Sequence, residues 1–217
     1  MATPLQHESQ YRGADAVTSR ASKIIAICGC GALGSNLAEN LARQGWTRLI
    51  LIDKDRVEAH NLGNQAYSHT DVGRFKAAAL SDKLFNIMRF DLPSSTGELN
   101  QYNVRKLLRE ANLVVDCFDN SASRQVVQTE CRRAKLDCLH VGLAEGYGEV
   151  IWDQSYQVPS DVDQGNGAPC DQPLARNLVV LTVIVACETI ASWQDGKRRS
   201  FTVTLRDLKI EEVDALP

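Results

Sequence analysis

The stretch Lys23-Ile-Ile-Ala-Ile-Cys-Gly-Cys-Gly-Ala-Leu-Gly34 decides the fold of this chain. Residues 24–28 form a short apolar run, rich in β-branched side chains, that is typical of a buried strand. Gly29, Gly31 and Gly34 have the spacing G-x-G-x-x-G and lead into a helix. One glycine permits the tight turn, one lets a phosphate approach the backbone, and one lets the helix pack on the strand. The positive end of that helix favours an anionic ligand.

An acidic pair completes this pattern. A second apolar run, residues 49–52, ends at Asp53, about 20 residues beyond the glycines, where a carboxylate can hold the hydroxyls of a ribose. Asp55 follows in the same loop. The order of strand, glycine turn, helix (about 32–43), second strand and acid predicts a nucleotide site.

The rest of the chain alternates between apolar runs and helical patterns. Runs at 112–118 and 136–142 indicate further strands, so the sequence predicts an α/β fold with a Rossmann-like, mostly parallel sheet flanked by helices. Residues 147–152 and 201–205 favour a few antiparallel strands in the C-terminal part. We expect a single domain over residues 21–217.

Composition excludes several classes of function. The 217 residues are 44% hydrophobic and 24% charged, as in an ordinary globular protein. A formal charge of −3 gives no electrostatic reason to expect a nucleic-acid or membrane partner. The longest apolar stretch, 178–186, is too short to span a bilayer, and the start of the chain has no secretory pattern, so we expect a cytoplasmic protein. Seven cysteines without a C-x-x-C pair predict reduced, buried thiols and no zinc.

Residues 1–20 are polar, and we expect an irregular N-terminal arm. Arg12 and Arg20 are its notable charges. Two interpretations stay open: the arm is simply solvated, or one of these arginines reaches a nucleotide, in a partner subunit if not in its own.

Two charged residues can extend the nucleotide site. Lys76 lies in the first turn of a helix expected to run to about Ile87, where a cation opposes the helix dipole. It therefore either binds a phosphate or is a chance surface lysine. Asp119 follows the strand at 112–118, and it either holds a metal ion or caps the next helix, for which Asn120 is the other candidate.

A long loop rich in Gly, Pro and Asp spans residues 159–173. Loops of this length in a compact domain tend to be functional or disordered. Cys170 lies in it, shortly before a helix whose dipole would favour a thiolate, although Asp171 opposes that effect. Cys170 is either a nucleophile or a fortuitous thiol.

Four segments together resemble the ThiF/MoeB/HesA adenylating family, the homologues of ubiquitin-activating enzymes. They are Gly29-Cys-Gly-Ala-Leu-Gly34, Asp53-Lys-Asp-Arg-Val with Asn61-Leu, Asp71-Val-Gly-Arg-Phe-Lys76, and Asp116-Cys-Phe-Asp-Asn120. They match in order and spacing within residues 20–195. An NAD-dependent oxidoreductase, the third hypothesis, would explain only the first two segments.

The resemblance implies binding of ATP and magnesium and adenylation of the C-terminal glycine of a ubiquitin-like protein. The glycines would line the phosphate turn, and Asp53, with Asp55 beside it, would hold the ribose. Asn61 and Lys76 would face the phosphates, and Asp119 would coordinate magnesium. Family members pair through their adenylation domains, so a homodimer is expected.

Two departures from the family pattern stand out. Asn64 occupies the position of a nucleotide-binding arginine, so a phosphate contact is missing unless Arg12, Arg20 or Arg74 compensates. This departure motivates the alternative hypothesis of a non-catalytic scaffold subunit in an activating-enzyme complex. The paired zinc motifs common in the family are also absent, which again predicts no zinc.

The loop at 159–173 occupies the place of the family's crossover segment over the substrate tail. This placement favours Cys170 as the residue that accepts the activated glycine as a thioester. The glycine would then pass to a conjugating enzyme or a sulfur-transfer partner. Compact enzymes of this sort occur in bacterial ubiquitination-like systems, which makes a bacterial cytosolic role our hypothesis.

Overall fold

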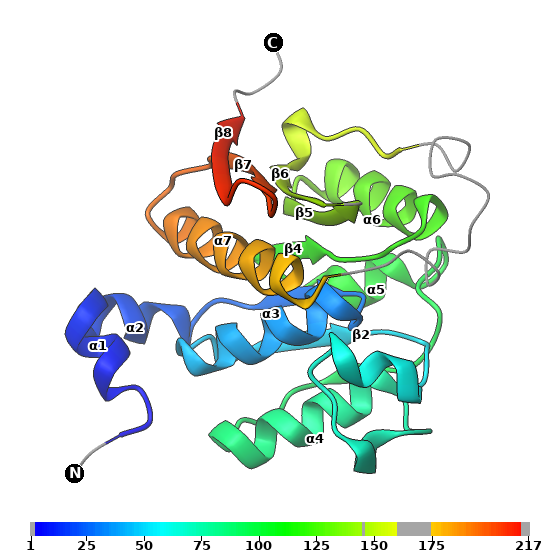
Figure 1. Ribbon diagram of the computed structural model, residues 1–217, viewed down its shortest axis with the longest axis horizontal. Helices are drawn as coiled ribbons and strands as arrows, with labels where there is room; N and C mark the ends of the chain where they lie inside the picture. The colour runs from blue at the N-terminus through cyan, green and yellow to red at the C-terminus, as the bar shows by residue number, and fades with distance from the viewer. Residues whose placement is uncertain (1–2, 145, 160–174, 214–217) are drawn as a thin grey trace.

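The computed structural model describes residues 3–144, 146–159 and 175–213. Within these residues, eight strands form one sheet with helices on both faces (Figure 1). The strands are β1 (Ile25–Cys28), β2 (Leu49–Ile52), β3 (Ser94–Ser95), β4 (Leu113–Asp116), β5 (Asp137–Ala144), β6 (Tyr147–Trp152), β7 (Ser200–Thr204) and β8 (Lys209–Val213). The α-helices are α1 (Gln6–Arg12), α2 (Ala14–Arg20), α3 (Ala32–Arg43), α4 (Lys76–Met88), α5 (Val104–Leu108), α6 (Ser121–Ala134) and α7 (Arg176–Gln194), and the short 3₁₀ helices are η1 (Ala59–Gly63), η2 (His69–Asp71) and η3 (Asp153–Ser155).

The sheet has the order β3-β2-β1-β4-β5-β6-β7-β8. The pairings from β3 through β5 are parallel, and those from β5 to β8 are antiparallel. This arrangement confirms the predicted fold class. One detail differs: residues 93–97 have the Pro, Ser and Gly content of a loop, yet Ser94 and Ser95 within them form the short edge strand β3.

Each face of the central strands packs against its own helices. On β1, Ile25 and Ile27 belong to the core formed with α3, α4 and α7. Ala26 and Cys28 belong to the core formed with α5 and α6. This two-sided burial explains why the strand is apolar throughout rather than alternating.

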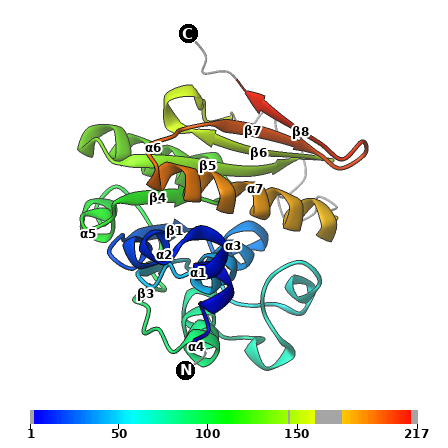
Figure 2. The ribbon, with the colours of Figure 1, turned by 90° about the vertical axis from the view of Figure 1, so that its left-hand side faces the viewer.

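Helix α7 is the central helix of the first face. By length and composition it could cross a membrane, but most of its surface is buried inside the protein. It packs against α3 and against β5, β6 and β7, as Figure 2 shows from the side. These contacts are those of a core helix.

The expected irregular arm is folded, and this prediction was wrong. Residues 6–20 form α1 and α2, which pack on one another and on the domain. Arg20 is buried, and its guanidinium donates to a Glu8 carboxylate oxygen and to the Gln44 carbonyl, both at 2.7 Å. Its guanidinium also lies 5.5 Å from the centre of the Trp46 ring. A buried arginine with several acceptors fixes this segment without the apolar periodicity that would have revealed a helix.

The glycine turn links β1 to α3 at the point where the sheet order reverses between β1 and β4. Gly29 has φ +92°, which favours glycine. A Cβ atom at Gly34 would lie 1.9 Å from the Gly29 carbonyl oxygen, whereas one at Gly31 would meet nothing within 4 Å. Gly34 therefore allows the helix to approach the turn, and Gly31 leaves open space above it.

We expect Gly34→Ala to lower the free energy of unfolding by about 3 kcal/mol, because the added methyl group must displace backbone. Urea denaturation measures this change. Gly31→Ala is the matched control, and it should change stability by less than about 1 kcal/mol because the site is open. Equal effects of the two substitutions would show that the close approach of α3 to the turn is not the constraint.

Candidate active site

A pocket opens at the carboxyl ends of β1, β2 and β4, where ligands bind in sheets of this kind. Three loops reach it side by side, since the amide of Gly29 donates to the Ile52 carbonyl and the amide of Cys117 to the Cys28 carbonyl, both at 2.8 Å. The pocket brings together six residues that the sequence singles out: Gly29, Gly31, Asp53, Asp55, Lys76 and Asp119.

Asp53 fixes the glycine turn. One of its carboxylate oxygens accepts from the amide of Cys30 at 2.6 Å, and the other accepts from the amide of Asp55 at 2.7 Å. Burial raises the pKa of Asp53, although these two hydrogen bonds oppose the shift. Each oxygen keeps a further lone pair, so the carboxylate can also accept from a hydroxyl group in the pocket.

Lys76 supplies a buried cation. It is the first residue of α4, and its side chain is only 11% exposed. Its Nζ lies 3.6 Å from the Asp55 carboxylate, and its amide donates to the Asp55 carbonyl at 2.8 Å. The hydroxyl of Tyr67 lies 2.8 Å from the Cys30 carbonyl and 3.2 Å from that of Lys76, which ties the start of α4 to the glycine turn.

The role of helix cap at the start of α6 belongs to Asn120. Its side-chain oxygen accepts from the amide of Ser123 at 2.9 Å. Asp119 is exposed in the pocket, where its carboxylate receives a 3.3 Å hydrogen bond from Asn120. Asp119 therefore does not cap α6, which was one of the two roles that the sequence allowed for it.

No group of three or more His, Cys, Asp or Glu side chains that could hold a metal ion occurs within residues 3–144, 146–159 and 175–213. Magnesium needs no such group, because it is commonly bound through one or two carboxylates together with substrate phosphates. The exposed carboxylate of Asp119 fits that kind of site.

Three of the residues singled out in the sequence do not line the pocket. Gly34 lies beneath the turn. Asn61 is buried, and its side-chain oxygen accepts from the amide of Glu58 at 2.9 Å, so it holds the start of η1. Asn64 is fixed through its carbonyl, which accepts from the Asn36 side chain on α3 at 2.9 Å. Cys170 lies outside the described residues.

The arginines expected to compensate for Asn64 have other partners. Arg12 forms a hydrogen-bonded ion pair with Glu188, and Arg20 pairs with Glu8. Arg74 pairs with Asp82 and also lies 3.4 Å from Asp71. Arg176, at the start of α7, instead donates to the Asn64 carbonyl at 3.0 Å. The sequence pattern did not indicate this arginine, because its proximity depends on how α7 packs beside α3.

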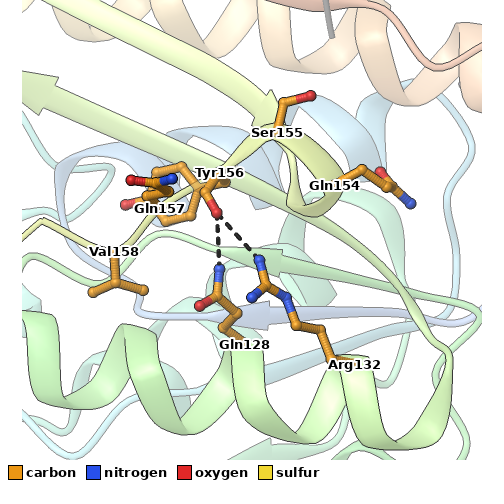
Figure 3. A pocket seen from close by; sticks show the side chains of 7 residues that line it. All are labelled: Gln128, Arg132, Gln154, Ser155, Tyr156, Gln157 and Val158. Atoms are coloured by element: carbon orange, nitrogen blue, oxygen red, sulfur yellow. Dashed lines mark hydrogen bonds between the residues drawn. The ribbon is translucent and has the colours of Figure 1, made fainter. Parts of the chain in front are cut away.

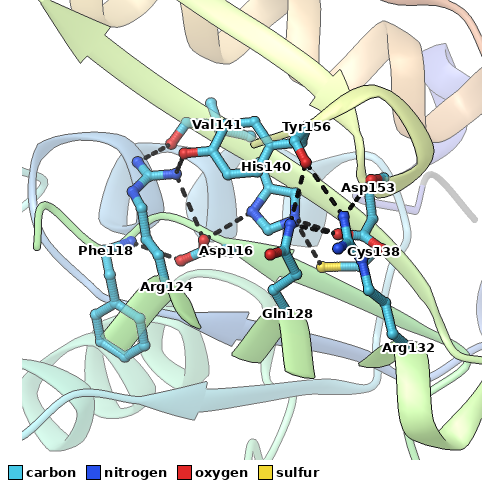
Figure 4. Close-up of polar contacts among 10 residues, drawn as sticks. All are labelled: Asp116, Phe118, Arg124, Gln128, Arg132, Cys138, His140, Val141, Asp153 and Tyr156. Atoms are coloured by element: carbon cyan, nitrogen blue, oxygen red, sulfur yellow. Dashed lines mark hydrogen bonds and ion pairs between the residues drawn. The ribbon is translucent and has the colours of Figure 1, made fainter. Parts of the chain in front are cut away.

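A buried polar network adjoins the pocket, and sequence reasoning missed it (Figure 4). Asp116 and His140 are fully buried, with His140 Nδ1 2.8 Å from an Asp116 carboxylate oxygen. His140 Nε2 lies 3.2 Å from an Asp153 oxygen, and the ring stacks on Tyr156 at 3.9 Å between centres. Arg124 contributes hydrogen bonds to the Tyr156 hydroxyl at 2.8 Å and to Asp116 at 3.4 Å. In the sequence, His140 within the apolar run 136–142 was the feature that could have indicated this network.

One face of α6 holds the segment that follows β6. Gln128 donates to the Asp153 carboxylate at 2.9 Å, and Arg132 donates to its other oxygen at 2.8 Å. Both side chains also donate to the Tyr156 carbonyl at 3.2 Å (Figure 3). Near the start of the helix, the Ser121 hydroxyl donates to the Pro159 carbonyl at 2.6 Å. The segment 153–159 is thus fixed along α6, and its end at Pro159 is bonded to Ser121, next to the pocket residue Asn120.

The model of the ThiF family matches residues 9–171, which is most of the chain. The chain belongs to the ThiF family. Across 168 residues, 73% of the chain, it is 32% identical to the sulfur carrier protein ThiS adenylyltransferase of Bacillus subtilis (strain 168). It is 28% identical over 137 residues, 57% of the chain, to ubiquitin-like modifier-activating enzyme 5 of Aedes aegypti.

Solved structures agree on the fold. This ThiF-family chain is similar to E. coli MccB in a crystal structure with ATP, with a TM-score of 0.79 and 16% identity over 96% of the chain and 69% of MccB. A structure of MccB with MccA-N7isoASN gives a TM-score of 0.81 at 17% identity over 96% of the chain and 70% of MccB. The chain spans 50% of the Bacillus relative and 34% of the Aedes one.

The buried network makes stability depend on acid pH. Burial opposes ionisation of Asp153, but hydrogen bonds from His140, Arg132 and Gln128 lower its pKa to about 2, from an ordinary value of 3.8. A lowered pKa in the folded protein stabilises it above the ordinary pKa, and the stabilisation is lost as pH falls through the folded value.

We therefore expect Asp153→Asn to lower the free energy of unfolding at pH 6, and the difference from the wild type to shrink as the pH falls from about 4 toward 2. Urea denaturation at a series of pH values measures it. Asp91→Asn, at an exposed aspartate, should change stability little at any pH. A difference for Asp153→Asn that stays constant with pH would contradict the assignment.

Proposed function

We propose that this chain catalyses ATP- and magnesium-dependent adenylation of the C-terminal glycine of a ubiquitin-like protein. One observation carries the proposal: the buried cation of Lys76 and the exposed carboxylate of Asp119 share one pocket with the glycine turn. The names of the relatives, a ThiS adenylyltransferase and a ubiquitin-like modifier-activating enzyme, support this class of substrate.

The chemistry explains why these residue types are needed. A carboxylate of the partner attacks the α-phosphorus, the bond to the β-phosphate breaks, and pyrophosphate leaves. Both reactants are anions, so their approach needs positive charge. Lys76 and the amide groups at the start of α3 would provide it. Asp119, together with the phosphates, would hold magnesium, which would supply further charge compensation.

An NAD-dependent oxidoreductase does not account for these two residues, because hydride transfer needs no compensation of phosphate charge in the reaction. The scaffold hypothesis keeps one specific argument, since Arg12, Arg20 and Arg74 pair with carboxylates elsewhere and Asn64 itself carries no charge. Affinity for MgATP separates this hypothesis from the enzyme, because a scaffold of this kind needs no nucleotide.

A second step involves Cys170. We propose that its thiolate attacks the acyl carbon of the adenylate, so that a thioester forms and AMP leaves. Two described residues on either side of residues 160–174 support this step: Pro159 is held by Ser121 at the start of α6, and Arg176 is held at Asn64 beside α3. Both α6 and α3 begin at the pocket, so these two residues lie on the helices and loops that border it.

The wider assembly follows from the family and is also proposed. The protein would act as a homodimer in the cytoplasm and would pass the glycine to a conjugating enzyme or a sulfur-transfer partner. A gene encoding a small protein with a C-terminal glycine, next to the gene for this chain, would identify the partner to use in the assays.

We expect Lys76→Gln to weaken MgATP binding by about 30-fold, because a buried hydrogen bond to a charged group contributes about 2 kcal/mol. Isothermal titration calorimetry with MgATP measures binding without a partner. Lys106→Gln, at an exposed lysine of α5, is the control and should bind like the wild type. If the wild type binds no MgATP, the scaffold hypothesis replaces the enzyme.

For the thioester, the full chain is incubated with ATP, magnesium and the glycine-tailed partner and analysed on a non-reducing gel. We expect an adduct that dithiothreitol removes and that Cys170→Ala abolishes. Cys187→Ala, at a buried cysteine of α7, is the control and should retain the adduct. An adduct that persists in Cys170→Ala would assign the thioester to another residue.

A further inference from the structure

We propose that His140 is a positioning residue of the nucleotide site. Through the carboxylate of Asp116, it fixes the turn that presents Phe118 and Asp119 to the pocket. The proposal rests on the proposed function for its metal-binding consequence, while its structural consequence can be measured in the protein without ligands.

His140 is held on both edges of its ring. Its Nδ1 lies 2.8 Å from Asp116 and its Nε2 lies 3.2 Å from Asp153, while the face of the ring stacks on Tyr156 (Figure 4). Burial disfavours the charged ring, but the hydrogen bonds to both carboxylates outweigh burial and raise the pKa of His140. The imidazolium form donates from both nitrogens, which matches these two contacts.

Asp116 transmits this constraint to the pocket. One carboxylate oxygen receives the 2.8 Å contact from His140 and a longer one, 3.4 Å, from Arg124. The other oxygen accepts from the backbone amide of Phe118 at 3.1 Å. Burial raises the pKa of Asp116, but the charge of Arg124 and the hydrogen bond from His140 outweigh it and lower the pKa below its ordinary value. An ionised carboxylate accepts at both oxygens, so His140 preserves the acceptor that holds Phe118.

The turn is short, so one backbone hydrogen bond has a large effect on it. β4 ends at Asp116 and α6 begins at Ser121, with Cys117, Phe118 and Asp119 lining the pocket between them. The carboxylate of Asp119 is exposed, and its own contact is a 3.3 Å hydrogen bond from the adjacent Asn120. The hydrogen bonds of the Cys117 amide to Cys28 and of the Ser123 amide to Asn120 hold the two ends of the turn, and the bond from the Phe118 amide to Asp116 holds the residue directly before Asp119.

A purely structural role would not require this residue type. Burying ionised groups is costly, and well-packed apolar side chains of similar volume often stabilise a fold as well or better. The two ring nitrogens contact different carboxylates and therefore have different roles. Nδ1 contacts Asp116, which holds the turn at the pocket, and Nε2 contacts Asp153 in the segment after β6. Two conservative substitutions can separate these roles.

The experiment compares His140→Asn with His140→Gln. The amide nitrogen of asparagine lies close to the position of Nδ1 and can still donate to Asp116, whereas that of glutamine lies close to the position of Nε2 and can donate only toward Asp153. The first measurement is amide hydrogen exchange at residues 117–120 in the ligand-free protein, relative to exchange in β2. We expect faster exchange at Phe118 in His140→Gln and nearly wild-type exchange in His140→Asn.

The second measurement is the magnesium concentration that half-saturates nucleotide binding. Loss of a partner that orients a metal ligand typically weakens binding by 10-fold or more, so we expect about a 10-fold increase in His140→Gln and less than about 2-fold in His140→Asn. Asp137→Asn is the control: it is the first residue of β5 and pairs with the start of β4, away from Asp116, and Arg198 and Trp193 bind its side chain, so the substitution should destabilise the fold without changing either measurement.

Three outcomes would overturn the proposal: equal changes in the two His140 variants, changes that merely follow lost stability as in Asp137→Asn, or a larger change in His140→Asn. If His140→Gln does not fold, Asp116→Asn takes its place, because it weakens the acceptor of the Phe118 amide and should speed exchange there, while Asp153→Asn loosens only the Nε2 side and should leave that exchange unchanged. A protein that binds no MgATP contradicts the proposed function, while hydrogen exchange at Phe118 still decides the role of His140.

Discussion

The close approach of α3 to the end of β1 is the constraint on which the rest of the structure depends. With no side chain at Gly34, the helix lies directly against the Gly29 carbonyl, and a Cβ atom at Gly31 would meet nothing within 4 Å. Asp53 then bonds the amide of Cys30 and ties the end of β2 to the same turn. A bulkier residue at the contact would move the helix away from the sheet and open the pocket at its base.

The sequence predicted this part of the fold well because local rules govern it. Glycine spacing, unbroken apolar strands and an acid after the second strand are each encoded within a few residues. Local rules do not explain Arg20. Its polar surroundings in the sequence predict a solvated charge, yet its side chain is buried against Gln44 and Trp46. Its partners lie in a distant element, so no local pattern could indicate that residues 6–20 fold.

The site was predictable to a similar extent. Asp119 follows a recognisable strand and Lys76 begins a recognisable helix, and both line the pocket at the carboxyl ends of the parallel strands. Asn61 and Asn64 could not be placed in this way, because their positions depend on the conformation of the loop after β2. There the Asn61 side chain and the Asn64 carbonyl form hydrogen bonds within the protein. His140 and Asp153 were hidden for another reason, because their meaning comes from pairing across the sheet with Asp116 and with one face of α6.

The charges in the pocket disfavour a polyphosphate that arrives as a simple anion. Four carboxylates and two lysines line it, namely Asp53, Asp55, Glu98, Asp119, Lys54 and Lys76. Both lysines already face carboxylates, since Lys54 bonds Glu98 and Lys76 lies 3.6 Å from Asp55. Under the proposed function, positive charge would have to enter with the nucleotide or be released from Asp55 as it binds. A divalent cation at Asp119 would meet the first condition and the exposed Asp55 carboxylate would meet the second, which would make the acidic pocket complementary to a metal-bound nucleotide.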